Sequence, residues 1–156
     1  MDSTKNTILD EETKLELRRV QVDLLDHLDR ICKKHNITYW LDFATLLGAY
    51  RYKTFMPVDD DIDVSIADQD YERFLKIAQA ELPANVFLQT QKTDKEYTEC
   101  YAKFRHLDST FLQKAKASGT HFGIYIDIFP SYEYPKLPKI ILKILLYATG
   151  RFRSRA

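Results

Sequence analysis

Apolar residues recur three and four positions apart early in the chain, which is the spacing of one face of an α-helix. This spacing predicts one long amphipathic helix over residues 10–35, ended by Asn36. A second stripe predicts another helix, which Asp68 caps and Pro83 ends. The first stripe comprises Leu17, Val20, Leu24, Leu28 and Ile31, and the second comprises Tyr71, Phe74, Leu75, Ala78 and Leu82. Each helix therefore has an apolar face that can cover a sheet.

Segments rich in β-branched and aromatic residues lie between and after these helices, and they predict strands. The expected strands are residues 37–43, 60–66, 86–90, 99–106 and 123–129. A short helix over residues 45–51 should follow the first strand, and residues 53–58 should form a loop because Pro57 blocks regular pairing. Helix and strand alternate without a linker or repeat, which predicts one compact α/β or α+β unit.

The last segment, residues 137–156, should begin as a short apolar helix over residues 137–148. About a dozen residues cannot span a bilayer, which needs roughly 20. Two interpretations stay open: a core helix with a solvated basic end, or a helix on an anionic membrane surface. Its basic residues are Lys136, Lys139, Lys143, Arg151, Arg153 and Arg155.

Composition limits the function classes. Lysine plus arginine (23) equal aspartate plus glutamate (23), so no overall field draws the chain to nucleic acid. Its 156 residues suit a single domain with a real core. Cys32 and Cys100 match neither a disulfide framework nor a zinc set, so we expect reduced, packed thiols. Residues 1–16 are polar and lack the apolar core of a signal peptide, which predicts a cytoplasmic protein.

The candidate chemistry centres on four carboxylates within five residues: Asp59, Asp60, Asp61 and Asp63. Like charges this close repel one another unless a cation offsets the repulsion. Magnesium, which prefers carboxylate and phosphate oxygens, is the expected ion, and manganese is an alternative. The run therefore predicts a metal site for phosphate chemistry.

Strand alternation divides the run. Asp61 and Asp63 should share one face, while Ile62 and Val64 pack beneath. Asp59 has the same parity as this pair, but Asp59 and Asp60 stand at the strand entrance. There they could form a turn or support the metal ligands from outside as readily as bind metal.

A calcium-binding EF-hand loop is the competing interpretation of the same run. Aspartates at alternate positions fit it, but Val64 stands where the loop needs glycine and Pro57 interrupts the entering helix. We therefore disfavour a calcium module.

Three ordered motifs resemble the LicD family of phosphocholine transferases, which belongs to the nucleotidyltransferase-fold superfamily and includes the fukutin-related phosphotransferases. They are ATLLGAYR at residues 44–51, FMPVDDDID at residues 55–63 and GIYIDIFP at residues 123–130. The resemblance covers about residues 20–133. It implies a single α+β domain with a mixed sheet flanked by helices, in which residues 10–35 form the N-terminal helix and residues 36–133 the catalytic core.

The resemblance also implies a reaction and a site. The expected reaction moves phosphocholine from CDP-choline to a sugar hydroxyl of a cell-surface glycan, such as teichoic acid, lipopolysaccharide or capsule. The inner face of the plasma membrane is an alternative location to the bulk cytoplasm. Asp61 and Asp63 would hold one or two magnesium ions. Asp127 would add a third carboxylate from a neighbouring strand and take the proton of the acceptor hydroxyl. Alternatively, Asp127 caps a turn before Pro130.

Further residues are expected to contact the donor. Thr45 and Gly48 would line the donor turn. Arg51, Lys103 and Arg105 could neutralise phosphate oxygens, although Lys103 and Arg105 on a strand would more often form a solvated face. Choline needs aromatic faces for cation-π contact, and the candidates are Trp40, Tyr50, Tyr52, Phe55 and Tyr101.

The chain departs from the family pattern at Ala44, Tyr52, Thr54 and Val58, where glycine, histidine, glycine and tryptophan are usual. The family also commonly extends further beyond the third motif. Two alternatives therefore stay open: a transferase of the same fold with another CDP-linked polyol or a nucleoside triphosphate as donor, or a shortened, inactive nucleotide-binding remnant.

Overall fold

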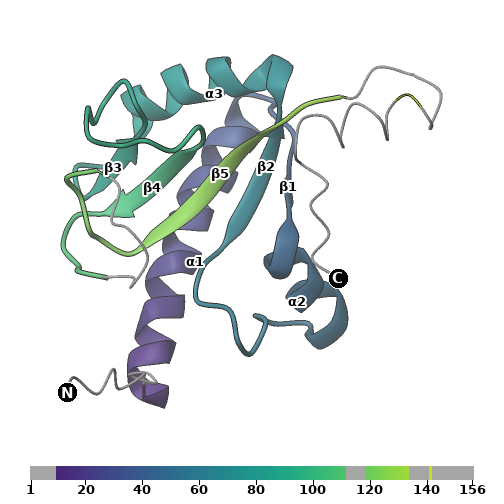
Figure 1. The fold of residues 1–156 in the computed structure, drawn as a ribbon, viewed down its shortest axis with the longest axis vertical. Coiled ribbons are helices and arrows are strands. Elements are labelled where there is room, and N and C mark those ends of the chain that lie inside the picture. The colour runs from purple at the N-terminus through teal and green to yellow at the C-terminus, as the bar shows by residue number, and fades with distance from the viewer. Residues whose placement is uncertain (1–9, 112–118, 134–140, 142–156) are drawn as a thin grey trace.

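The computed structural model describes residues 10–111, 119–133 and 141. Helices and strands follow one another in the predicted order (Figure 1). They are α1 (Glu11–Lys34), β1 (Tyr39–Leu41), α2 (Phe43–Tyr52), β2 (Asp63–Ala67), α3 (Asp68–Glu81), β3 (Val86–Gln89), β4 (Ala102–His106) and β5 (Tyr125–Ser131). The long N-terminal helix is confirmed, and Asn36 adopts a positive φ of 52° just after it.

The strands form one mixed sheet in the order β1-β2-β5-β4-β3. β2 and β5 run parallel, and the other neighbouring pairs are antiparallel. β5 therefore lies between two strands that precede it in the chain, which brings residues far apart in sequence side by side. The predicted α+β class with a mixed sheet and flanking helices is confirmed.

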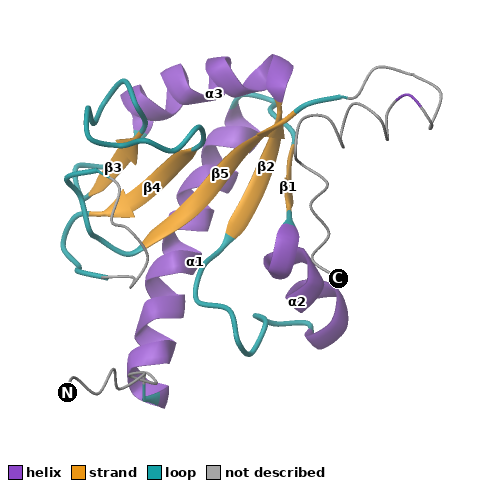
Figure 2. Cartoon of the chain, viewed as in Figure 1, coloured by secondary structure: helices purple, strands orange, loops and turns teal. Residues whose placement is uncertain are grey.

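The hydrophobic core lies where α1 and α3 pack against the sheet; α1 crosses behind the strands and α3 runs along the top of the view in Figure 2. Leu24 and Leu28 of α1 and Phe74 of α3 are fully buried there. The predicted stripes are thus confirmed as the inner faces of the two helices. The strands contribute Val64, Ile66, Val86, Leu88, Ala102, Phe104, Ile126 and Ile128.

Alternation along the strands places polar and aromatic residues on the opposite face. Register pairs Asp63 with Asp127 across β2 and β5, and Lys103 with Asp127 across β4 and β5. Tyr125 and Phe129 have the same parity as Asp127 and share its face. We call this the polar face; it carries the candidate site.

All five predicted strands begin too early or end too late, and the first, second and fourth differ most from the structure. The first spans only Tyr39–Leu41, because the Asp42 carboxylate accepts a hydrogen bond from the Phe43 N–H (2.8 Å) and caps α2 there. β2 starts at Asp63 rather than residue 60, so Asp61 precedes the strand. β4 starts at Ala102 rather than residue 99.

Two residue-level predictions also need correction. Asp68 is not the cap of α3: Ala67 occupies that position without a side-chain hydrogen bond, and Asp68 is the first helical residue. Cys32 is buried as expected, but Cys100 is exposed in the loop before β4. Both thiols are free.

The predicted C-terminal helix lies almost wholly outside the described residues. Among the helices that the structure does describe, none is long and apolar enough to cross a bilayer.

Candidate active site

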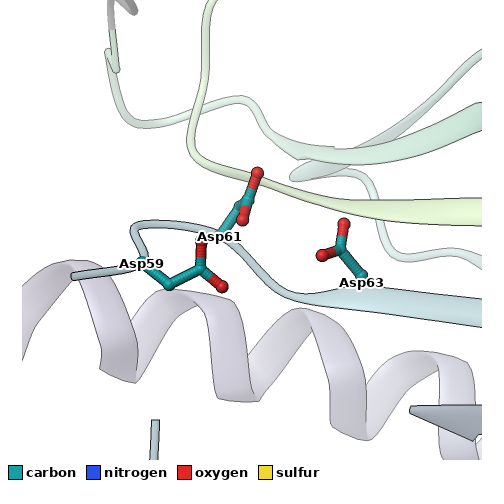
Figure 3. A group of neighbouring side chains, drawn as sticks. All are labelled: Asp59, Asp61 and Asp63. Carbon is teal, nitrogen blue, oxygen red and sulfur yellow. The ribbon is translucent and has the colours of Figure 1, made fainter. Parts of the chain in front are cut away.

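Three carboxylates converge where the chain enters β2. One oxygen from each of Asp59, Asp61 and Asp63 lies within 4.8 Å of the other two. Figure 3 shows the three side chains projecting into a common space from the turn and from the strand start. We call this group the carboxylate trio. Asp60 is exposed and is not part of it.

Contacts with α1 and α2 hold the trio in place. The Gln21 side chain, buried in α1, donates a hydrogen bond to the Asp60 carbonyl (2.7 Å). The Asp63 N–H donates to the Thr45 hydroxyl of α2 (2.9 Å). Ile62, which is 2% exposed, anchors the segment in the core between the carboxylates. The turn before β2 is therefore fixed on both sides.

The three carboxylates of the trio repel one another, and burial disfavours their charged forms. Burial, followed by the charges of Asp63 and Asp59, raises the pKa of Asp61 to about 7. Burial and the neighbouring carboxylates of Asp127 and Asp59 raise the pKa of Asp63 to about 6. Burial also raises the pKa of Asp59. Such shifts mean that ionising all three groups costs free energy unless a cation joins them.

The donor set fits a divalent cation. Asp59 Oδ2 is buried and has no hydrogen-bond partner among the described residues, although a buried carboxylate oxygen is costly to leave unpaired. Carboxylate oxygens are the ligands that magnesium and manganese favour. Asp59, Asp61 and Asp63 are thus suited to hold such an ion. The EF-hand interpretation, which the sequence already disfavoured, is excluded because Asp63–Ala67 form a strand.

Asp127 lies beside the trio but is engaged by lysine. Its N–H donates to the Ile62 carbonyl (2.8 Å), and its register partner is Asp63. The Lys103 ammonium forms an ion pair with Asp127 Oδ1. Burial raises the pKa of Asp127, and the Lys103 charge opposes that rise. The alternative role of capping a turn is not observed, because Asp127 lies within β5.

Lys103 and Arg105 do not form a solvated face. They are 6% and 7% exposed, and both cations lie over the ring of Tyr125, at 3.7 Å from Lys103 Nζ and 4.6 Å from Arg105 Cζ. The pKa of the Lys103 ammonium is lowered because the side chain is buried, and its pairing with Asp127 opposes this shift. Lys103 is therefore buried on the polar face, with its ammonium paired to Asp127.

Sequence reasoning missed a buried hydrogen-bond network behind these cations. Arg105 donates to the Gln89 side-chain oxygen (2.6 Å), and Gln89 donates to Asp94 (2.8 Å). Asp94 also accepts from the Thr120 N–H (2.7 Å). Gly119 is required here: it adopts a φ of +92°, and an added Cβ would lie 2.2 Å from Gln89 Nε2. No local sequence pattern signals a network that joins such distant segments.

The residues expected to contact the donor from α2 are Thr45, Gly48 and Arg51, and each has a different environment. Gly48 is buried, and an added Cβ would lie 2.5 Å from the Met56 backbone nitrogen, so this glycine lets the loop before the trio approach α2. Thr45 contacts β2, as described above. Arg51 is exposed in the last turn of α2, and none of the described residues forms an ion pair with it.

Comparison with known proteins identifies the family. Residues 36–142 match the family described as LicD/FKTN/FKRP, nucleotidyltransferase domain, and the chain belongs to this family. The matched range contains the whole carboxylate trio together with Lys103 and Asp127.

Two relatives extend the comparison. The lipopolysaccharide cholinephosphotransferase LicD of Haemophilus influenzae is 33% identical over 136 residues, which cover 85% of this chain and 50% of that protein. An uncharacterized protein of Rickettsia typhi is 34% identical over 109 residues, covering 69% of this chain and 33% of that protein. The chain thus spans half or less of the length of these relatives.

Proposed function

We propose that this chain is the catalytic domain of a magnesium-dependent transferase that moves phosphocholine from CDP-choline to a hydroxyl group of a cell-surface glycan and releases CMP. The observation that carries the proposal is the carboxylate trio, held at the start of β2 within a LicD-family domain. The named activity of the Haemophilus relative supports choline phosphate as the transferred group.

Asp59, Asp61 and Asp63 would hold the metal, and their raised pKa values are consistent with that role because a cation relieves the repulsion. A bound magnesium ion would neutralise phosphate oxygens and act as a Lewis acid. The trio alone binds the ion in this proposal, and Asp127, which Lys103 holds in an ion pair, has a separate role.

Asp127 would accept the proton of the acceptor hydroxyl. The acceptor oxygen forms a bond to the phosphorus of phosphocholine while the phosphorus–oxygen bond to CMP breaks, and the hydroxyl proton passes to a carboxylate. Burial raises the pKa of Asp127, which makes its carboxylate a stronger base. Lys103, through its ion pair, would hold that carboxylate in the correct orientation.

Nucleotide donors are available inside the cell, so we place the reaction on the cytoplasmic side of the membrane, where a glycolipid or lipid-linked glycan would present its sugar hydroxyl.

Release of CMP from CDP-choline tests the proposal. The protein is incubated with magnesium, CDP-choline and a hexosamine-containing glycan, and CMP is quantified by chromatography. We expect release that chelation abolishes and that Asp61→Asn lowers about 100-fold or more. Asp60→Asn, which removes an exposed carboxylate one residue away, is the matched control and should retain most of the activity.

Two other outcomes would change or contradict the proposed donor. Release from a CDP-linked polyol but not from CDP-choline would replace the donor and keep the reaction class. Calorimetry that detects no binding of any cytidine nucleotide with magnesium would contradict the proposal.

A further inference from the structure

Three aromatic side chains continue the polar face away from the carboxylates. The rings of Phe43 and Phe129 lie 5.1 Å apart, and those of Phe129 and Tyr101 lie 4.4 Å apart. We call these residues the aromatic row. Phe129 follows Asp127 by two positions on β5, so the row begins roughly 7 Å along the strand from that carboxylate.

Phe43 has an unusual backbone for a bulky residue. Its φ is +46°, in the left-handed region, and its side chain is 61% exposed. Asp42 holds this conformation: one carboxylate oxygen accepts from the Phe43 N–H (2.8 Å) and the other accepts from the Ser65 hydroxyl (2.7 Å). The backbone strain is thus not offset by burial of the ring, and strain of this kind is characteristic of functional sites.

Carboxylates lie near the row. Asp42 adjoins Phe43, and burial followed by the carboxylates of Asp127 and Glu99 raises the pKa of Tyr101. The nearby Lys103 ammonium lies 5.2 Å from the Tyr101 ring, but its charge is paired with Asp127. Phe43 is exposed, and Phe129 and Tyr101 are partly exposed. Accessible aromatic faces near carboxylates attract a bulky cation and do not favour an anion.

We propose that the aromatic row of Phe43, Phe129 and Tyr101 binds the quaternary ammonium group of the donor by cation-π contact. This inference rests on the proposed function, because it assigns the choline end of CDP-choline to the row while the diphosphate lies at the carboxylate trio. The ammonium and phosphate of phosphocholine are joined by a short two-carbon link, which suits a row that begins beside Asp127.

The test compares the complete donor, CDP-choline, with CMP, which lacks the choline end. Calorimetry measures binding of CDP-choline and of CMP, both with magnesium, to the wild type and to Phe43→Leu and Phe129→Leu. Leucine keeps the apolar volume and removes the ring. We expect each variant to bind CDP-choline about tenfold more weakly and CMP as well as the wild type does. Tyr50→Leu, which removes a 76% exposed ring at the far end of α2, should change neither affinity.

Nuclear magnetic resonance with choline chloride separates this inference from the proposed function. Saturation transfer to the choline methyl protons should occur with the wild type and disappear with Phe129→Leu, even if no CMP is ever released. Equal losses for CDP-choline and CMP would show that the row stacks the cytosine base. Unchanged CDP-choline affinity in both ring variants would also overturn the inference.

Discussion

At the scale of residues, the site combines three carboxylates that repel one another with a fourth that is neutralised. Among the described residues, no lysine or arginine forms an ion pair with Asp59, Asp61 or Asp63, whereas Lys103 forms one with Asp127. Breaking a buried ion pair by removing one partner typically costs about 3–5 kcal/mol, so Lys103 is also important for folding. The trio is available for a metal, and Asp127 is not equivalent to it.

The position of Asp59 leads to a prediction that the spacing of the aspartates alone could not make. Asp59→Asn should lower the affinity for magnesium about tenfold or more, because it removes a charged oxygen from the trio. Asp60→Asn should change the affinity less than about twofold, because that side chain is exposed and only its backbone carbonyl is used. Calorimetric titration measures the magnesium affinity of both variants. Equal losses of affinity in Asp59→Asn and Asp60→Asn would show that Asp59 is not a metal ligand distinct from Asp60.

At the scale of elements, α2 determines where β2 begins. Asp42 at its N-terminus donates its N–H to the Asp63 carbonyl (3.0 Å), and Thr45 one turn later accepts from the Asp63 N–H. Gly48, one turn further, contacts the loop over residues 54–56. The short helix therefore positions the trio although none of the three carboxylates lies on it.

Gly48→Ala should destabilise the protein although alanine favours helices. Helix propensity alone would contribute up to about 1 kcal/mol of stability. The added Cβ would meet backbone atoms of Met56 and Thr54 at 2.5 and 2.9 Å, and overpacking costs about 1–3 kcal/mol. We therefore expect a net loss of stability in urea denaturation. Ala49→Gly, the neighbouring helical control, should show the ordinary propensity loss, and a stabilised Gly48→Ala would refute this role of Gly48.

Local patterns predicted the elements well because they depend on local physics. The apolar stripe in α1 follows from helical periodicity, and the alternation of Asp63 and Val64 between the two faces of β2 follows from strand periodicity. Asp61 precedes β2, so its place beside Asp63 depends on the turn before the strand. The pairing of Asp127 with Lys103 depends on the register of β4 and β5, which no local signal encodes. The strand before α2 was predicted too long because the capping bond of Asp42 overrides the β propensity of its neighbours.

At the scale of the whole molecule, one face of the sheet stabilises the fold and the other carries charge. The apolar face packs against α1 and α3, while the polar face gathers the trio, the Lys103–Asp127 pair and the aromatic row. A real core on one side allows the domain to tolerate electrostatic strain on the other.

That strain predicts a pH dependence. The pKa of Asp61 rises from 3.8 to about 7 on folding, so without metal its contribution to stability is lost progressively as the pH rises from about 4 to about 7. Asp61→Asn removes this titration. In urea denaturation with a chelator, we expect the variant to be more stable than the wild type at pH 7.5 and the difference to shrink towards pH 4. With saturating magnesium at pH 7.5, the wild type should instead be more stable than Asp61→Asn. A pH-independent difference would contradict the assignment.

We propose that the carboxylate trio binds a divalent cation together with a choline nucleotide. Calorimetric titration of CDP-choline into the protein, with magnesium and with a chelator, tests it most directly. Asp63→Asn is the variant, and Asp68→Asn, on the exposed first turn of α3, is the control. We predict binding with magnesium by the wild type and by Asp68→Asn, and its loss with the chelator or with Asp63→Asn. Binding of equal strength with and without magnesium would contradict the account.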